Sequence, residues 1–195
     1  MEIATIKRAL RNDEHCGDHY GYWNHNGTSL LCMVDGLGHG KHAEVASHAA
    51  VEYVAQHREE PLKDILLGCD RAIRDTRGVA MGLALIDRAN GSLRYSGVGN
   101  TRARILTDRY RKSYHLPSAY GIVGGGIRSV SLETYHFEGD GLVIMYTDGL
   151  REVFDMSSYP NEILDDVGAL AKRLLDDWSR ANDDAAVLVF KNSRA

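Results

Sequence analysis

Apolar residues in the N-terminal part of the chain recur mainly at strand-like spacing. A first strand is expected within residues 3–10, although the apolar alternation there is imperfect. Residues 20–23 and 28–34 are expected to pair as a hairpin around residues 24–27, because Asn26-Gly27 favours a tight turn. The chain is therefore expected to begin with strands rather than helices.

The same spacing returns in the second half of the chain. Strands are expected at residues 79–86, 92–98 and 102–106, with Asn90-Gly91 as the turn between the first two. A further hairpin is expected between residues 130–137 and 142–147, around residues 138–141. A last strand is expected at residues 185–190.

Three segments carry apolar residues at helical spacing instead. A helix over residues 41–57 would have one apolar face, made of Ala43, Ala46, Ala49, Ala50, Tyr53 and Val54. A second helix is expected to begin at Pro61, with a stripe of Leu62, Ile65, Leu66, Cys69 and Ile73. A third, over residues 161–178, would place Ile163, Leu164, Val167, Leu170, Leu174 and Trp178 on one side.

The order of these elements predicts the fold class. Strands dominate, and the helices come in two blocks instead of alternating with strands one by one. This order favours antiparallel sheets with helices packed outside over a doubly wound parallel sheet. We find no internal repeat or long linker, so residues 1–195 are expected to form one domain.

Composition and charge exclude several classes of function. The chain has 195 residues, 44% of them hydrophobic and 26% charged, with a formal charge of −4 and a pI near 6.1. This balance argues against nucleic-acid binding, and no apolar run approaches the length that a bilayer requires. Residues 1–8 lack the apolar stretch of a signal peptide, and three cysteines without CxxC spacing indicate reduced thiols. We therefore expect a cytoplasmic protein.

Two apolar segments end in Asp-Gly, at Asp35-Gly36 and at Asp148-Gly149. A carboxylate at the end of a core strand is costly unless a cation meets it there. Glycine after the acid lets the backbone turn sharply, or lets a carbonyl reach a ligand. Two such ends suggest two strands that deliver Asp to one metal cluster.

Other acidic residues share this placement. Asp18 stands just before an expected strand, and Asp183 and Asp184 stand just before the last one. Mg²⁺ and Mn²⁺ prefer oxygen ligands, so these carboxylates and the Gly36 carbonyl would suit a two-metal cluster. Such a cluster can generate hydroxide at neutral pH and clamp a phosphoryl group.

Each of these positions also has an ordinary explanation. An isolated Asp-Gly is usually a turn, and Asp183-Asp184 could be a simple loop. Residues 36–40, Gly-Leu-Gly-His-Gly, match neither GxGxxG nor GxxxxGK[ST], so a nucleotide-binding loop ranks last. No GxSxG, HExxH or Cys/His cluster supports another reaction type, and only His39, in the glycine loop, invites a role.

Taken in chain order, these motifs resemble the metal-dependent serine/threonine protein phosphatases of the type 2C (PPM) family, in particular the SpoIIE-like branch. The matching segments are residues 16–18 (Cys-Gly-Asp), 34–40 (Val-Asp-Gly-Leu-Gly-His-Gly), 97–100 (Gly-Val-Gly-Asn), 146–150 (Tyr-Thr-Asp-Gly-Leu) and 182–187 (Asn-Asp-Asp-Ala-Ala-Val). They span nearly the whole chain in the family order. The short length, Arg77-Gly78-Val79, and Leu116-Pro117 before a Gly-rich stretch are most similar to the members that reset the stressosome, a bacterial stress-sensing complex.

The resemblance implies an α+β fold of two antiparallel β-sheets packed as a sandwich with α-helices on the outside. It also implies a centre of two Mn²⁺ or Mg²⁺ ions. By motif position, Asp35 would bridge both metals and Gly36 would lend its carbonyl. Asp148 and Asp183 would hold one metal, and Asp18 would support the other through water.

The implied activity is that of a phosphoserine/phosphothreonine protein phosphatase. Hydroxide activated by the metals would attack phosphorus directly, so no covalent phosphoenzyme is expected. The substrate would be a phosphorylated regulatory protein of the stressosome scaffold type, with neither a nucleic acid nor a membrane as partner. Asn100 would support the loops of the cluster. The oligomeric state stays open, with a monomer as one option.

Two departures from the family pattern concern the phosphate and the leaving group. Eukaryotic members carry an Arg upstream of the first acidic motif that grips the phosphate, whereas residues 13–18 contain none and only Arg11 lies nearby. They also carry a His directly after the Asp-Gly, where this chain has Leu37, so His39 or a metal-bound water would have to protonate the serine. A pseudophosphatase that docks a phosphoprotein or kinase without turnover is therefore the second hypothesis.

Overall fold

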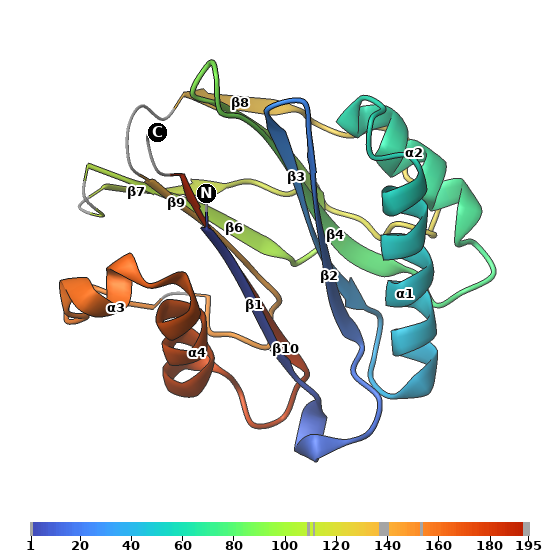
Figure 1. Ribbon diagram of the computed structural model, residues 1–195. Helices are drawn as coiled ribbons and strands as arrows, with labels where there is room; N and C mark the ends of the chain where they lie inside the picture. The colour runs from blue at the N-terminus through green and yellow to red at the C-terminus, as the bar shows by residue number, and fades with distance from the viewer. Residues whose placement is uncertain (1, 109, 111, 137–140, 153, 193–195) are drawn as a thin grey trace.

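Two five-stranded antiparallel sheets lie face to face in the structure, a computed structural model that describes residues 2–192 except 109, 111, 137–140 and 153 (Figure 1). The first, called the β1 sheet, has the order β1 (Glu2–Arg8), β10 (Ala185–Asn192), β9 (Gly141–Tyr146), β6 (Arg102–Thr107) and β7 (Lys112–Leu116). The second, called the β2 sheet, has the order β2 (Asp18–His25), β3 (Thr28–Gly36), β4 (Val79–Asp87), β5 (Ser92–Val98) and β8 (Glu133–His136).

Helices cover the outer faces of both sheets. The helices α1 (Lys41–Gln56) and α2 (Leu62–Ala72) pack on the β2 sheet. On the other side, α3 (Asn161–Asp165) and α4 (Val167–Trp178) pack on the β1 sheet (Figure 1). A short 3-10 helix, η1 (Leu10–Asn12), follows β1. The layers run helix, sheet, sheet, helix, which confirms the expected α+β sandwich.

Both faces of the central strands are buried, as β3 illustrates. Leu31 and Met33 point into the core between the sheets, whereas Leu30, Cys32 and Val34 point into the core beneath α1 and α2. Successive side chains of a strand point to opposite faces, so a strand with a core on each side needs an almost continuous apolar run. That run ends at Asp35, where the strand leaves the two cores.

The expected turns and helix starts are confirmed to within about a residue. Asn26 and Gly27 have φ angles of 44° and 80°, the left-handed conformations that a two-residue hairpin turn requires. The hairpin of β4 and β5 pairs Asp87 with Ser92 next to its turn. In α2 the first helical residue is Leu62, because Pro61 has an extended ψ of 138° and occupies the N-cap position.

The expected hairpin between residues 130–137 and 142–147 is wrong. β8 pairs with β5 in one sheet, whereas β9 lies between β10 and β6 in the other. All six residues of β9 are buried, which only a central strand provides, whereas β8 is mostly exposed and lies at a sheet edge. The expected turn at residues 138–140 lies outside the described residues.

The single helix expected over residues 161–178 is also wrong. Asp166 has φ −103° and ψ 106°, which ends α3 and starts α4. Its carboxylate accepts hydrogen bonds from the N–H groups of Gly168 and Ala169, at 2.8 and 3.0 Å. An aspartate N-cap thus overrides a helical spacing that continues through it. Sequence reasoning also missed β7, an exposed edge strand without apolar alternation.

Two further expectations concern membrane-spanning segments and the state of the three cysteines. Among the described helices, none is long and apolar enough to cross a membrane. Cys16, Cys32 and Cys69 are free and buried.

Candidate active site

One end of the sandwich collects the acidic residues singled out in the sequence. Asp18 at the start of β2 is the register partner of Asp35 near the end of β3. Residues directly opposite each other in an antiparallel pair place their side chains on one face, about 5 Å apart at Cβ. Asp148 follows β9 and Asp183 precedes β10, and these two strands are antiparallel neighbours. Their adjoining ends bring both acids to the same edge.

Hydrogen bonds join the two sheets at this end. The Thr147 hydroxyl donates to Asp18 Oδ2 at 2.6 Å and accepts from the Ala186 N–H at 2.9 Å. The Asp184 carboxylate accepts from the Gly17 N–H at 2.8 Å and from the Leu10 N–H at 2.6 Å. Asp184 is therefore engaged with the loop before β2, whereas the Asp183 carboxylate accepts a hydrogen bond from its neighbour, the Asp184 N–H, at 3.0 Å.

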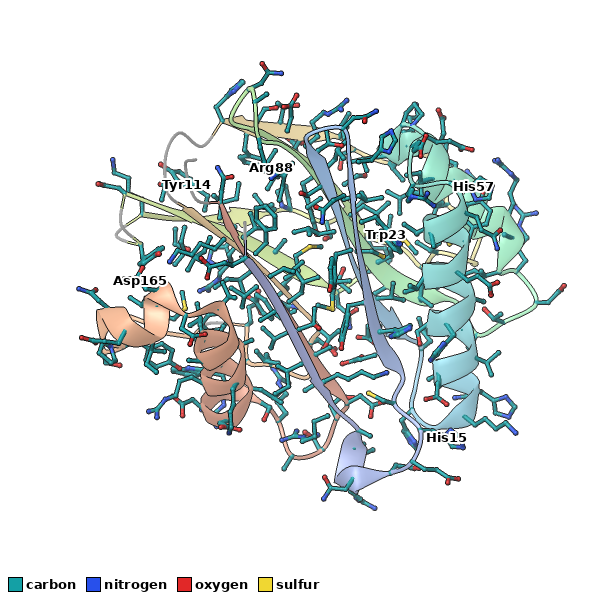
Figure 2. The ribbon with its side chains drawn as sticks, viewed as in Figure 1. His15, Trp23, His57, Arg88, Tyr114 and Asp165 are labelled. Carbon is teal, nitrogen blue, oxygen red and sulfur yellow. The ribbon has the colours of Figure 1, made fainter. Side chains whose placement is uncertain are left out.

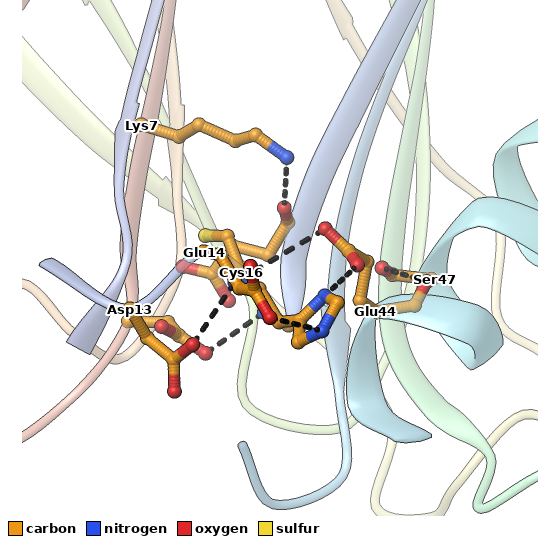
Figure 3. A network of polar contacts seen from close by, with 10 residues as sticks. Lys7, Asp13, Glu14, Cys16, Glu44 and Ser47 are labelled. Carbon is orange, nitrogen blue, oxygen red and sulfur yellow. Dashed lines mark hydrogen bonds and ion pairs between the residues drawn. The ribbon is translucent and has the colours of Figure 1, made fainter. Parts of the chain in front are cut away.

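A second polar network holds the loop before Asp18 against α1. His15 Nδ1 lies 2.7 Å from Glu44 Oε2, and the Cys16 N–H donates to Glu44 Oε1 at 3.4 Å. Figure 3 shows Cys16 and Glu44 within this network. Lys7 donates to the backbone oxygen of Asp18 at 3.1 Å, not to its carboxylate. His15 marks this end of the molecule in Figure 2, and Arg88 marks the opposite end. The position of Asp18 is thus determined by contacts from β1, β2 and α1.

The carboxylates at this end raise one another's pKa, so the group favours bound protons or a cation over free negative charge. Burial, with repulsion from Asp184, Asp183 and Asp148, raises the pKa of Asp18 to about 8. Burial, followed by repulsion from Asp18 and Asp148, raises the pKa of Asp35 to about 9. Burial and the neighbouring Asp148 also raise the pKa of Asp183. A cation bound among these groups would relieve both the desolvation and the repulsion.

The two glycines after the strand-end acids are required by close backbone contacts. A Cβ on Gly36 would lie 2.2 Å from the Ala43 carbonyl oxygen of α1, and one on Gly149 would lie 1.7 Å from the Asp184 carbonyl oxygen. Neither contact partner is a flexible side chain, so no larger residue fits. Both Asp-Gly pairs therefore have a packing role whether or not a ligand is bound.

The donor atoms at this end fit a hard divalent cation by their chemistry, although the side chains do not converge on one point. Among the described residues, no three His, Cys, Asp or Glu side chains lie in a geometry that could hold a metal ion. Asp148 acts on Asp35 through repulsion and a side-chain hydrogen bond, and Asn100 donates to Asp148 Oδ2 at 2.6 Å. The set is made of carboxylate and carbonyl oxygens, the ligands that Mg²⁺ and Mn²⁺ prefer. The individual ligand assignments stay predictions.

His39 lies in the loop between β3 and α1, beside this acidic end. Its side chain is exposed, and among the described residues it makes no hydrogen bond or ion pair. Gly38 and Gly40 on either side have φ angles of 87° and 73°, so this loop needs glycine for its sharp strand-to-helix turn. That turn accounts for the glycines without a nucleotide. The catalytic role of His39 stays a prediction.

A cleft beside the acidic end was missed by sequence reasoning. It has a volume of about 770 Å³, and its lining includes Ala80, the register partner of Asp35, and Asn100. Most of its remaining lining residues come from the segment of residues 120–129. The sequence left open whether residues 114–126 or residues 154–161 face the substrate, and part of the first segment lines the cleft.

Sequence comparisons identify the family. The family model described as Stage II sporulation protein E (SpoIIE) matches residues 25–193, most of the chain. The phosphoserine phosphatase RsbX of Bacillus subtilis (strain 168) is 29% identical over 137 residues, which cover 70% of this chain and 68% of RsbX.

Solved structures agree in fold. A chain from work on the bacterial stressosome as a modular system that controls secondary messenger signalling has a TM-score of 0.86 and 26% identity, covering 96% of this chain and 97% of that chain. RsbX in complex with magnesium has a TM-score of 0.82 and 21% identity, covering 96% and 92%. The resemblance inferred from the ordered motifs is confirmed. The chain therefore belongs to the SpoIIE family and is a serine phosphatase with the type 2C fold.

Proposed function

We propose that this chain is a Mn²⁺- or Mg²⁺-dependent phosphoserine/phosphothreonine protein phosphatase that acts on a phosphorylated regulatory protein of the stressosome scaffold type. The observation that carries the proposal is the group of carboxylates at one end of the sandwich. Burial and mutual repulsion raise the pKa of Asp18 to about 8 and of Asp35 to about 9, a pattern typical of carboxylates that gather around a cation. The similarity to RsbX and to a stressosome-related structure supports the class of substrate.

The proposed ligands are the residues that the motifs indicate. Asp35 would bridge two ions and Gly36 would lend its carbonyl. Asp148 and Asp183 would hold one ion, and Asp18 would support the other through water. The register pairing of Asp18 with Asp35 supports this division, because it places both acids on one face of the β2–β3 ladder. When bound, two divalent ions would lower the pKa of a coordinated water and screen the charge of the phosphate.

Neighbouring residues of the chain would orient these ligands. Asn100 holds Asp148 through a 2.6 Å hydrogen bond, and Thr147 holds Asp18 through another of 2.6 Å. Asp184 accepts from two backbone N–H groups and so fixes the loop that carries Asp18. Such supporting bonds keep carboxylates in position as charge changes during the reaction.

Binding and turnover together test the proposal. We expect calorimetry to detect Mn²⁺ binding to the wild-type protein, and Mn²⁺ to be required for hydrolysis of p-nitrophenyl phosphate. Asp35→Asn should lose both, because it removes the charge of the bridging ligand. A protein that binds a phosphoprotein but takes up no divalent ion would instead be the pseudophosphatase of the second hypothesis.

A further inference from the structure

The cleft beside the acidic end is far larger than a phosphate group. Its volume is about 770 Å³, a size typical of sites that enclose a substantial ligand. At one side Leu37 and Asn100 border the carboxylates, since Asn100 donates directly to Asp148. If a phosphoserine reaches the carboxylates, the polypeptide around that phosphoserine must lie in or along this cleft.

Residues 120–129 form one wall of the cleft, and several of their side chains are exposed. Tyr120 and Ile122 are exposed apolar residues, and Arg128 is the one cationic side chain among the described residues that line the cleft. Arg128 is exposed, and within the described part of the chain it makes no hydrogen bond or ion pair. A cation without a partner, beside a strongly acidic site, is complementary to an anion that the protein does not itself supply.

A buried acid on α2 holds this wall in place. Asp70 Oδ1 accepts hydrogen bonds from the N–H groups of Gly124, Gly126 and Ile127, at 2.8, 2.9 and 3.1 Å. Gly124 and Gly126 have φ angles of 95° and 87°, so the backbone turns that aim these N–H groups at one oxygen need glycine. Three donors on a single buried carboxylate oxygen fix the segment that ends at Arg128.

We propose that residues 120–129, held by Asp70, form the substrate-recognition wall of the active site, and that Arg128 determines specificity by pairing with an anionic group of the phosphoprotein. That anion is either the phosphate itself or a carboxylate next to the phosphoserine. The inference rests on the proposed function, because it names the residue by which the same site selects its substrate. Asp70 acts through the wall and is a positioning residue.

Steady-state kinetics with three probes test the role of Arg128. The probes are p-nitrophenyl phosphate, a phosphoserine peptide flanked by Glu, and the same peptide with Gln in place of Glu. For Arg128→Ala we expect the KM of the Glu peptide to rise about tenfold, with a smaller fall in kcat. Arg128→Lys should restore part of the affinity. Arg88→Ala, at the opposite end of the β2 sheet, is the matched control and should change nothing.

The probes distinguish the two sources of the anion. An equal rise in KM for all three means that Arg128 pairs with the phosphate, whereas a rise for the Glu peptide alone means that it pairs with the flanking carboxylate. Unchanged KM values for all three would overturn the inference. It would also be overturned if Arg77→Ala raised KM instead, since Arg77 is an exposed cation beside Gly38 that does not line the cleft.

Variants at Asp70 test the positioning of the wall. Asp70→Asn keeps an acceptor oxygen, so it should raise the peptide KM less than Asp70→Ala does, with a larger effect on peptides than on p-nitrophenyl phosphate. If the wild-type protein hydrolysed nothing, the proposed function would fail. Calorimetric binding of the Glu peptide would then still test the inference, which requires weaker binding by Arg128→Ala.

Discussion

His39 is the exposed residue nearest in sequence to the proposed bridging ligand that could give a proton to the leaving serine. Protonation matters for a serine alkoxide, which is a poor leaving group, but not for p-nitrophenolate, which departs without a proton. We therefore expect His39→Ala to slow hydrolysis of a phosphoserine peptide by about 100-fold and to affect p-nitrophenyl phosphate much less. Equal effects on both substrates would assign the proton donor elsewhere.

Gly36 has both a packing role against α1 and a proposed role as a metal ligand through its carbonyl. An added Cβ would lie 2.2 Å from the Ala43 carbonyl oxygen, so Gly36→Ala must push α1 away from β3. We expect a loss of about 2–3 kcal/mol in the free energy of unfolding, measured by urea denaturation. Gly168→Ala in α4 is the control, because its nearest neighbour is a carboxylate oxygen at 3.3 Å. A neutral Gly36→Ala would show that this contact is not rigid.

At the scale of elements, the break between α3 and α4 depends on one side chain. Asp166 caps α4 by accepting from two N–H groups at its start. Asp166→Ala should lower the free energy of unfolding by about 1 kcal/mol, whereas Asp166→Asn should retain most of the capping. Thermal unfolding followed by circular dichroism measures both, and identical melting temperatures for Asp166→Ala and wild type would contradict the capping role.

Local sequence patterns predicted most of the strands and helices, but they did not predict which strands pair with each other. The strand ends at Asp35 and Asp148 were visible because an apolar run stops at an acid. The hydrogen bond between Thr147 and Asp18 joins residues 129 apart, and no local spacing announces it. The same holds for β8 and β9, which are near in sequence but belong to different sheets. Pairing is decided by burial on both faces, which a single strand pattern does not encode.

The sequence contains a clue to the proposed recognition wall, residues 120–129, that local patterns alone do not resolve. Asp70 directly follows Cys69 in the apolar stripe of α2, and a buried acid at such a position must find hydrogen-bond donors. Its donors are the glycine-rich residues more than fifty positions later. Asp70 and the glycines can each be noted in the sequence, but the contact between them is evident only in the folded structure.

Across the whole molecule, the acidic end makes stability depend on pH and metal. The pKa of Asp35 is about 9 in the folded protein against 3.8 for an ordinary aspartate, so the folded state binds more protons than the unfolded chain between these values. The metal-free protein should be most stable near pH 4 and should lose stability as pH rises towards 9. Calorimetric melting temperatures after chelation measure this, and Asp35→Asn should show a weaker pH dependence.

Saturating Mn²⁺ should reverse this loss near neutral pH. An ion at 100 times its Kd adds about 2.7 kcal/mol, or roughly 5 °C or more in melting temperature for a domain of this size. Asp35→Asn should gain far less from the same addition. A wild-type melting temperature that is independent of both pH and Mn²⁺ would contradict the proposed cation site.

The most direct test of the account is Mn²⁺-dependent phosphate release from a phosphorylated stressosome scaffold protein. Wild-type protein should release phosphate with Mn²⁺ and stop when the ion is chelated. Asp35→Asn should lose at least about 100-fold in rate, because the bridging carboxylate is gone. Equal rates for wild type and Asp35→Asn, or full activity in chelator, would contradict the claim that these carboxylates form the catalytic metal centre.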